Sequence, residues 1–201
     1  MKLRLLGGTL AALMLAACGG GDDATGFGNP PTIENPPAAA GGKLSFAYIQ
    51  KCINPILLAQ LQVTDGAVTS TNSCAGGGCH SSVNGAGGAL RVTPTTQTVD
   101  PGNPANTLDI IRASDMYKNF YSSQGVTSPG APTLSRLLNK PLLQGVLHGG
   151  GRIFADPQDP NAKLIQYWIS HPAPAGQDEF SSASNALFTP PDANTGTCNT
   201  Q

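Results

Sequence analysis

The stretch Cys74-Ala-Gly-Gly-Gly-Cys79-His80 places two thiols and an imidazole close together in a chain of 201 residues. Covalent haem attachment requires these groups, because each thiol adds to one vinyl group and the histidine that follows can turn its ring under the iron. The usual spacing has two residues between the thiols, and here there are four. All four are small and three are glycine, so they can bulge out without moving the thiols far apart. The motif therefore predicts one covalent haem c, attached at Cys74 and Cys79, with His80 as an iron ligand.

Two other interpretations of these residues stay open. Cys74 and Cys79 could form a disulfide with each other beside an unrelated His80. The three side chains could also contribute to a zinc site, but zinc requires a fourth ligand at suitable spacing, and none is close in the sequence.

Charge and composition narrow the classes of protein. Eleven Lys and Arg face twelve Asp and Glu, a formal net charge of -1, and charged residues make up 11% of the chain, where roughly 25% is usual. A nucleic-acid-binding protein is therefore excluded. The 25 glycines and 17 prolines predict a loop-rich fold. Because aromatic residues are only 5%, a buried cofactor is expected to supply part of the core, and the length suits one domain with accessory segments.

The N-terminal segment is typical of an exported protein. Residues 1–17 have a basic start, a short apolar run and small residues at the end, which predicts a signal peptide. Leu15-Ala16-Ala17-Cys18 resembles the lipobox of bacterial lipoproteins, which implies lipidation of Cys18 and a membrane anchor; a plain cleaved signal is the alternative. The outer membrane is the favoured location, with the protein facing the periplasm or the cell surface. Residues 18–43 are poor in large apolar side chains and are expected to form a flexible tether.

The hydrophobic pattern predicts helices and no run of alternating strands. Apolar residues at steps of three and four predict a helix from Phe46 to Leu61, interrupted at Pro55. A helix that opens at Asp159-Pro160 is expected to end at His171. Shorter helices are expected at 106–113, at 116–121 and from Ser135 to Pro141. Residues 70–88 are expected to be a loop, and 176–201 an irregular tail.

Segments on both sides of the motif resemble the monohaem cytochrome c family, in particular bacterial lipoproteins that carry one such domain. In that family one helix precedes the haem motif and a helix near the C-terminus crosses it. The segments that carry the resemblance are 46–57 and 165–169, which are similar to these two helices, and 87–92, 135–142 and 148–154 between them. The resemblance covers about residues 44–172. It implies a mainly α, cytochrome c-like small helical domain with long irregular loops, placed at residues 44–175.

The chain departs from the commonest family pattern in its longer haem spacer, in an insertion near 93–131 and in lacking a methionine at the usual ligand position. The family places the second iron ligand before the last helix, which implies His148 here, and the three glycines after it let the backbone pass close to the porphyrin. Met116 as the ligand, or an iron without a strong sixth ligand, stays open. Arg91 and Arg152 are candidates to pair with the haem propionates, and solvated arginines are the alternative.

Cys52 and Cys198 are the two cysteines that the predicted lipidation and haem attachment do not use. Paired thiols are the rule in an oxidising compartment, so a disulfide between them is predicted. Such a link would dock the 176–201 tail onto the first helix. Two free thiols, or a link to another chain, are the alternatives.

The sequence therefore predicts a single-electron carrier, tethered to a membrane through its N-terminal lipid and exchanging electrons with redox partner proteins. No nucleophile, general base or pair of carboxylates indicates an enzyme. An exported lipoprotein stapled by disulfides that acts as a binding or structural module without a cofactor is the alternative. A haem protein with an open iron site, of peroxidase or gas-sensing type, is a third possibility.

Overall fold

The computed structural model describes residues 42–201; the predicted signal peptide, Cys18 and nearly all of the tether lie outside the described residues. The described chain begins with a helical stretch made of α1 (Phe46–Tyr48), the π-helical turn η1 (Ile49–Ile53) and α2 (Asn54–Leu58). The Ser45 side chain caps it by accepting the Tyr48 N–H. Pro55 lies in the first turn of α2, where a missing N–H costs little. The helix was expected to be interrupted at Pro55. The irregular part is instead the π-helical turn η1, which ends two residues before this proline.

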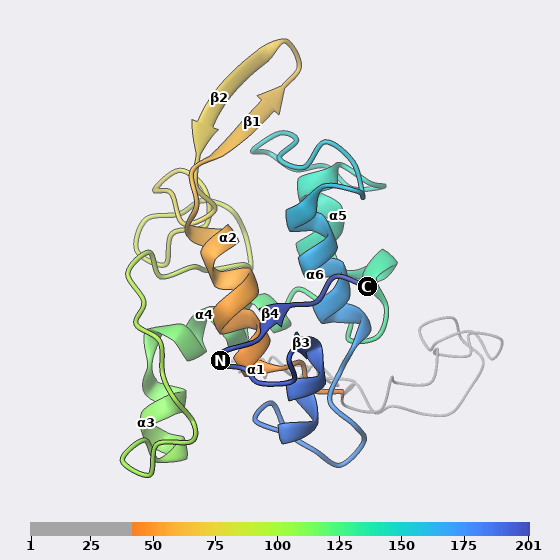
Figure 1. Ribbon diagram of the computed structural model, residues 1–201. Helices are drawn as coiled ribbons and strands as arrows, with labels where there is room; N and C mark the ends of the chain where they lie inside the picture. The colour runs from red at the N-terminus through yellow and green to blue at the C-terminus, as the bar shows by residue number, and fades with distance from the viewer. Residues whose placement is uncertain (1–41) are drawn as a thin grey trace, which may run out of the picture. The chain divides into compact units, whose positions relative to one another are not determined.

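A β-hairpin follows this helical stretch and was not predicted. Strands β1 (Leu61–Asp65) and β2 (Val68–Asn72) pair antiparallel, with Asp65 opposite Val68. The prediction of a loop from residue 70 was therefore wrong for the end of β2. Gly66 and Ala67 form the two-residue loop, and Gly66 has φ +58°, as the first position of a type II′ hairpin turn requires. In Figure 1 the hairpin projects from the end of α2, beyond the helices.

The expected fold class, mainly α, is also wrong. Helices hold 35% of the described residues and strands 11%, so the fold is mixed α/β with two small antiparallel sheets. The physical reason is that short, polar hairpins are stabilised by turn chemistry and by backbone pairing, which a search for apolar periodicity does not detect.

The middle of the chain forms the expected short helices. α3 (Leu108–Ala113) and α4 (Asp115–Gln124) each begin at a hydroxyl side chain, Thr107 and Ser114, which accepts a backbone N–H of the first turn. A single 3₁₀ turn, η2 (Pro132–Leu134), precedes α5 (Arg136–Leu142). Pro141 lies inside α5 and does not end it.

The last helix, α6 (Pro160–Ser170), packs against the first helical stretch. Asp159 caps it through the N–H groups of Asn161 and Ala162, as its sequence predicted. Trp168 is fully buried, and its Nε1 donates a 2.9 Å hydrogen bond to the Ser45 carbonyl. The two terminal helical segments therefore share one core. No helix within residues 42–201 is long and apolar enough to cross a bilayer.

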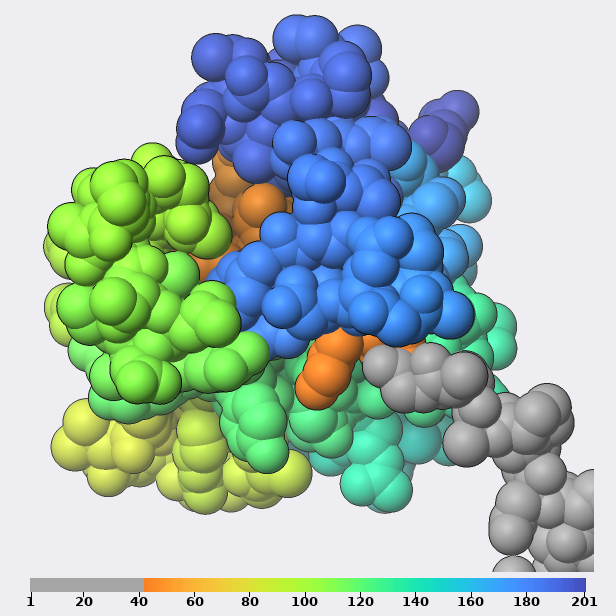
Figure 2. All heavy atoms as spheres, turned by 90° about the horizontal axis from the view of Figure 1, so that it is seen from below, coloured from red at the N-terminus to blue at the C-terminus, as the bar shows by residue number. Residues whose placement is uncertain are grey.

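The C-terminal tail is more ordered than the sequence suggested. It contains η3 (Ser182–Leu187) and a small sheet of β3 (Phe188–Thr189) and β4 (Thr197–Cys198). The predicted disulfide between Cys52 and Cys198 is confirmed, with the Cα atoms 6.1 Å apart. Leu187 and Phe188 are buried in the core, so the tail also docks through apolar contacts. Figure 2 shows this C-terminal segment, in blue, over the first helices, of which only small orange patches are visible on that face.

Candidate functional site

The segment from Cys74 to His80 folds into a compact turn. Cys79 N donates to Gly76 O at 2.9 Å, and His80 N donates to Cys74 O at 2.9 Å. The first and last residues of the motif are thus joined by one hydrogen bond, and the four-residue spacer loops out between the thiols. Both cysteines are half-buried thiols, outside any disulfide among the described residues.

The environment of the motif favours uncharged side chains. Burial, and to a lesser extent the neighbouring Cys79, raises the pKa of the Cys74 thiol to about 11. Burial lowers the pKa of His80, although a hydrogen bond to the Leu90 carbonyl opposes the effect. A neutral imidazole is the form that binds a metal ion.

A glycine-rich loop holds the His80 ring in place. Nδ1 of His80 lies 3.2 Å from Leu90 O, and His80 O accepts the Val92 N–H at 2.7 Å. Gly87 passes so close that a Cβ there would lie 2.5 Å from His80 Nδ1. Glycine at position 87 therefore allows the loop to pass directly against the His80 ring.

His148 faces His80 from the loop after α5. The two imidazole rings are parallel to within 7°, and their centroids are 6.1 Å apart. Nδ1 of His148 lies 2.7 Å from Gly151 O. Since a carbonyl oxygen only accepts hydrogen bonds, Nδ1 of each histidine carries the proton and Nε2 keeps its lone pair.

The separation of these two rings is that of two imidazoles bound to one metal ion. Metal–imidazole bonds are about 2 Å long, so two imidazoles on opposite sides of one ion have ring centroids roughly 6 Å apart. The observed 6.1 Å between His80 and His148 matches that separation. The carbonyl partner of each Nδ1 is the usual second contact that orients a ligating histidine.

Two cavities adjoin the pair. One, of about 190 Å³, is mainly apolar and is enclosed by side chains of α2, α5 and α6, including Leu57, Leu137 and Ile165. The other, of about 780 Å³, extends from Cys74 and Cys79 to the inner side of the hairpin. His80, Gly87, Gly88, Lys140 and His148 line both.

The other predicted iron-ligand and propionate-binding residues do not line these cavities. Met116 is buried on α4 and lines neither cavity. Arg91 donates to Gly85 O at 2.9 Å, and Arg152 pairs through its backbone with Thr64; neither lines a cavity next to His80. The propionate contacts of Arg91 and Arg152 stay predictions.

Two basic side chains that line the cavities were not predicted from the sequence. Lys140 borders both cavities, and Arg136 borders the smaller one. Both lie on α5, in the segment 135–142 that carries part of the family resemblance. Their spacing of four residues puts them on one face of that helix, but the sequence alone does not show that this face lines a cavity.

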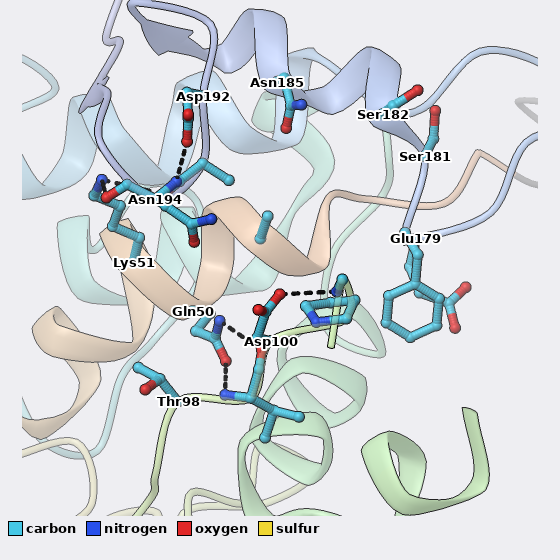
Figure 3. Close-up of a pocket in the computed structure, with 16 residues that line it drawn as sticks. Gln50, Lys51, Thr98, Asp100, Glu179, Ser181, Ser182, Asn185, Asp192 and Asn194 are labelled. Carbon is cyan, nitrogen blue, oxygen red and sulfur yellow. Dashed lines mark hydrogen bonds between the residues drawn. The ribbon is translucent and has the colours of Figure 1, made fainter. Parts of the chain in front are cut away.

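A third cavity, of about 670 Å³, lies between the first helices, the 98–102 loop and the C-terminal tail. Two of its long polar side chains are already hydrogen-bonded. Gln50 bonds the backbone of Val99 on both sides of its amide, and Lys51 donates to the carbonyls of Ala193 and Asn194. Figure 3 shows these groups turned toward their own backbone partners. These bonds join the first helices to the 98–102 loop and to the tail.

No group of three or more His, Cys, Asp and Glu side chains arranged to hold a metal ion occurs within residues 42–201. Comparison of the chain with protein-family models, with curated proteins and with solved structures found no match.

Proposed function

We propose that this protein is a single-electron carrier of cytochrome c type, with one haem attached covalently at Cys74 and Cys79. The observation that carries the proposal is the parallel pair of His80 and His148, with both Nδ1 atoms on backbone carbonyls. Porphyrin provides four of the six iron ligands, so a haem iron needs two protein ligands rather than a cluster of three or more. The donor set present fits that requirement.

The residues of the chain have separable roles in this proposal. Cys74 and Cys79 would hold the macrocycle, and His80 and His148 would supply imidazole nitrogens to its iron. The bound haem supplies a ferric/ferrous couple that accepts and releases one electron. Two imidazoles, without a thioether, favour the ferric state and give a lower potential than a His/Met pair.

Apolar side chains form much of the wall of the smaller cavity, where they would reduce the access of water to a bound haem. Leu57, Leu137 and Ile165 line this cavity together with the buried Phe154, and low solvent exposure is one of the features that set a haem potential. Lys140 and Arg136 place positive charge at the same wall, where carboxylates of a porphyrin would be neutralised.

The proposal includes the cellular setting predicted from the N-terminus. Lipid on Cys18 would hold the domain on the exported side of a bacterial membrane. The outer membrane is the favoured one. The substrate is then an electron from one redox partner protein, passed on to another. The protein has no catalytic residues of its own in this proposal.

Ligand replacement in purified holoprotein tests the assignment. The wild type is expected to show a low-spin, six-coordinate spectrum and no CO binding by the reduced form at neutral pH. His148→Ala opens one position and permits CO binding, whereas Met116→Leu leaves the spectrum unchanged. If Met116→Leu opens the site and His148→Ala does not, the proposed ligand pair is wrong.

A further inference from the structure

The β1–β2 hairpin contacts the loop that carries His148. Thr64 N donates to Arg152 O at 2.8 Å, and Arg152 N donates to Thr64 O at 2.8 Å. These two bonds form an antiparallel bridge between β1 and the residue after Gly151. In Figure 1 the hairpin and the loop after α5 lie next to each other at the same end of the molecule.

The bridge is coupled to the imidazole of His148 through Gly151. Gly151 O lies 2.7 Å from His148 Nδ1, and Gly151 N donates to His148 O at 2.9 Å. The turn from His148 to Gly151 is therefore closed on itself and attached to Thr64 by the next residue. Gly151 has φ +78°, and a Cβ there would lie 2.5 Å from Thr64 O, so only glycine allows this approach.

The other end of the hairpin is fixed at the cysteines. The Ser73 side chain and the Ala75 N–H both donate to the Leu57 carbonyl at 3.1 Å, on either side of Cys74. One element thus connects the first thiol to the loop of the opposite histidine. Because most hairpin residues are exposed, core packing does not account for this connection.

We infer that the hairpin is a positioning element that holds His148 opposite His80, and that Thr64 and Gly151 are its positioning residues. The inference rests on the proposed function, since it assigns how the second iron ligand is kept in place. The bridge restrains the 148–151 turn, so its loss lets His148 leave the position facing His80 while the thiols and His80 remain where they are.

A proline at Thr64 isolates the bridge. Thr64 and Thr69 form a non-hydrogen-bonded pair of the hairpin, so their N–H groups point away from the partner strand. Thr64→Pro therefore removes the bond to Arg152 and no ladder bond. Thr69→Pro is the matched control. It also introduces a proline into this cross-strand pair, but the N–H group that it removes lies on the open edge of the hairpin.

The decisive measurement is CO binding by the reduced holoprotein. Haem staining of denaturing gels checks that the haem is still covalently attached. Thr64→Pro and Gly151→Ala are expected to keep the haem and to raise the CO-accessible fraction by about tenfold, the scale of one lost backbone hydrogen bond. Added imidazole should restore their low-spin spectrum, and Thr69→Pro should match the wild type.

The outcomes separate this inference from the proposed function. Thr64→Pro and Gly151→Ala spectra identical to the wild type, or equal opening in Thr69→Pro, overturn the positioning role while leaving a haem protein. A wild type without covalent haem overturns the proposed function and this inference together.

Discussion

The Tyr117 hydroxyl donates a 2.7 Å hydrogen bond to Oε1 of Glu179. Arg112 Nη2 lies 3.3 Å from the same oxygen, and the Glu179 carbonyl accepts the Phe46 N–H at 2.9 Å. Glu179 is 4% exposed, so its nearly buried carboxylate ties the C-terminal tail to α3 and α4, and its backbone carbonyl ties the tail to α1. Burial by itself raises the pKa of Glu179, but the hydrogen bonds from Tyr117 and Arg112 outweigh it and lower the pKa below its usual value of 4.5.

Glu179→Gln is therefore expected to lower the free energy of unfolding by about 1 kcal/mol at pH 7. The folded-state pKa is the lower one, so the carboxylate stabilises the fold fully above its unfolded pKa. The difference between wild type and variant should shrink as pH falls below about 4.5. Urea unfolding at pH 7, 5, 4 and 3 measures it. Asp109→Asn, at an exposed position, is the control, and a difference independent of pH would refute the role of charge.

The disulfide makes a separate prediction for stability. Cys52 and Cys198 are 146 residues apart in sequence, and the loss of a native disulfide costs about 2–5 kcal/mol. Cys52→Ser with Cys198→Ser should lower the urea midpoint by a corresponding amount. Reductant should lower the wild-type midpoint to that of the double variant and leave the double variant unchanged. A midpoint insensitive to reductant in the wild type would show that this link does not restrain the tail.

Trp168→Phe tests the contact between the first and last helices. The change removes the hydrogen bond to the Ser45 carbonyl and part of a fully buried side chain, which costs about 2 kcal/mol. Thermal or urea unfolding measures the loss. Tyr121→Phe, at an exposed aromatic on α4, should change stability by less than a quarter as much; equal effects would argue against a shared core at Trp168.

Much of the local structure follows from short-range signals in the sequence. The caps at Asp159 and the apolar spacing after Phe46 predicted α6 and the first helical stretch, and the count of cysteines predicted the link from Cys52 to Cys198. The helix signals depend on residues within one helical turn, and the disulfide prediction depends on the pairing of thiols in an oxidising compartment. Neither requires knowledge of the tertiary structure.

The errors come from features that tertiary packing decides. The hairpin buries little apolar surface, so its signal is the turn glycine Gly66 rather than periodicity. The expectation of an unpacked tail overlooked Leu187 and Phe188, two apolar neighbours in a polar segment. Lys140 and Arg136 could not be preferred over Arg91 and Arg152 from sequence, because which cations line a cavity depends on how α5 packs.

Gly87→Ala tests the approach of the glycine-rich loop to His80. The added methyl group would lie 2.5 Å from Nδ1 of the ring, so His80 is expected to shift and the low-spin spectrum of the holoprotein to be lost in part. Gly78→Ala is the matched control inside the haem spacer, because nothing lies within 4 Å of a Cβ there. Equal spectra for Gly87→Ala and Gly78→Ala would remove the positioning role of Gly87.

The central claim is covalent haem at Cys74 and Cys79, and the mass of the mature protein tests it most directly. Protein exported by cells with haem c maturation machinery should carry the added mass of one haem after denaturation. That mass should lie on the peptide containing both cysteines and should be absent from the Cys74→Ala, Cys79→Ala double variant. A chain without added haem, in which Cys74 and Cys79 are either alkylated or joined to each other, would contradict the account.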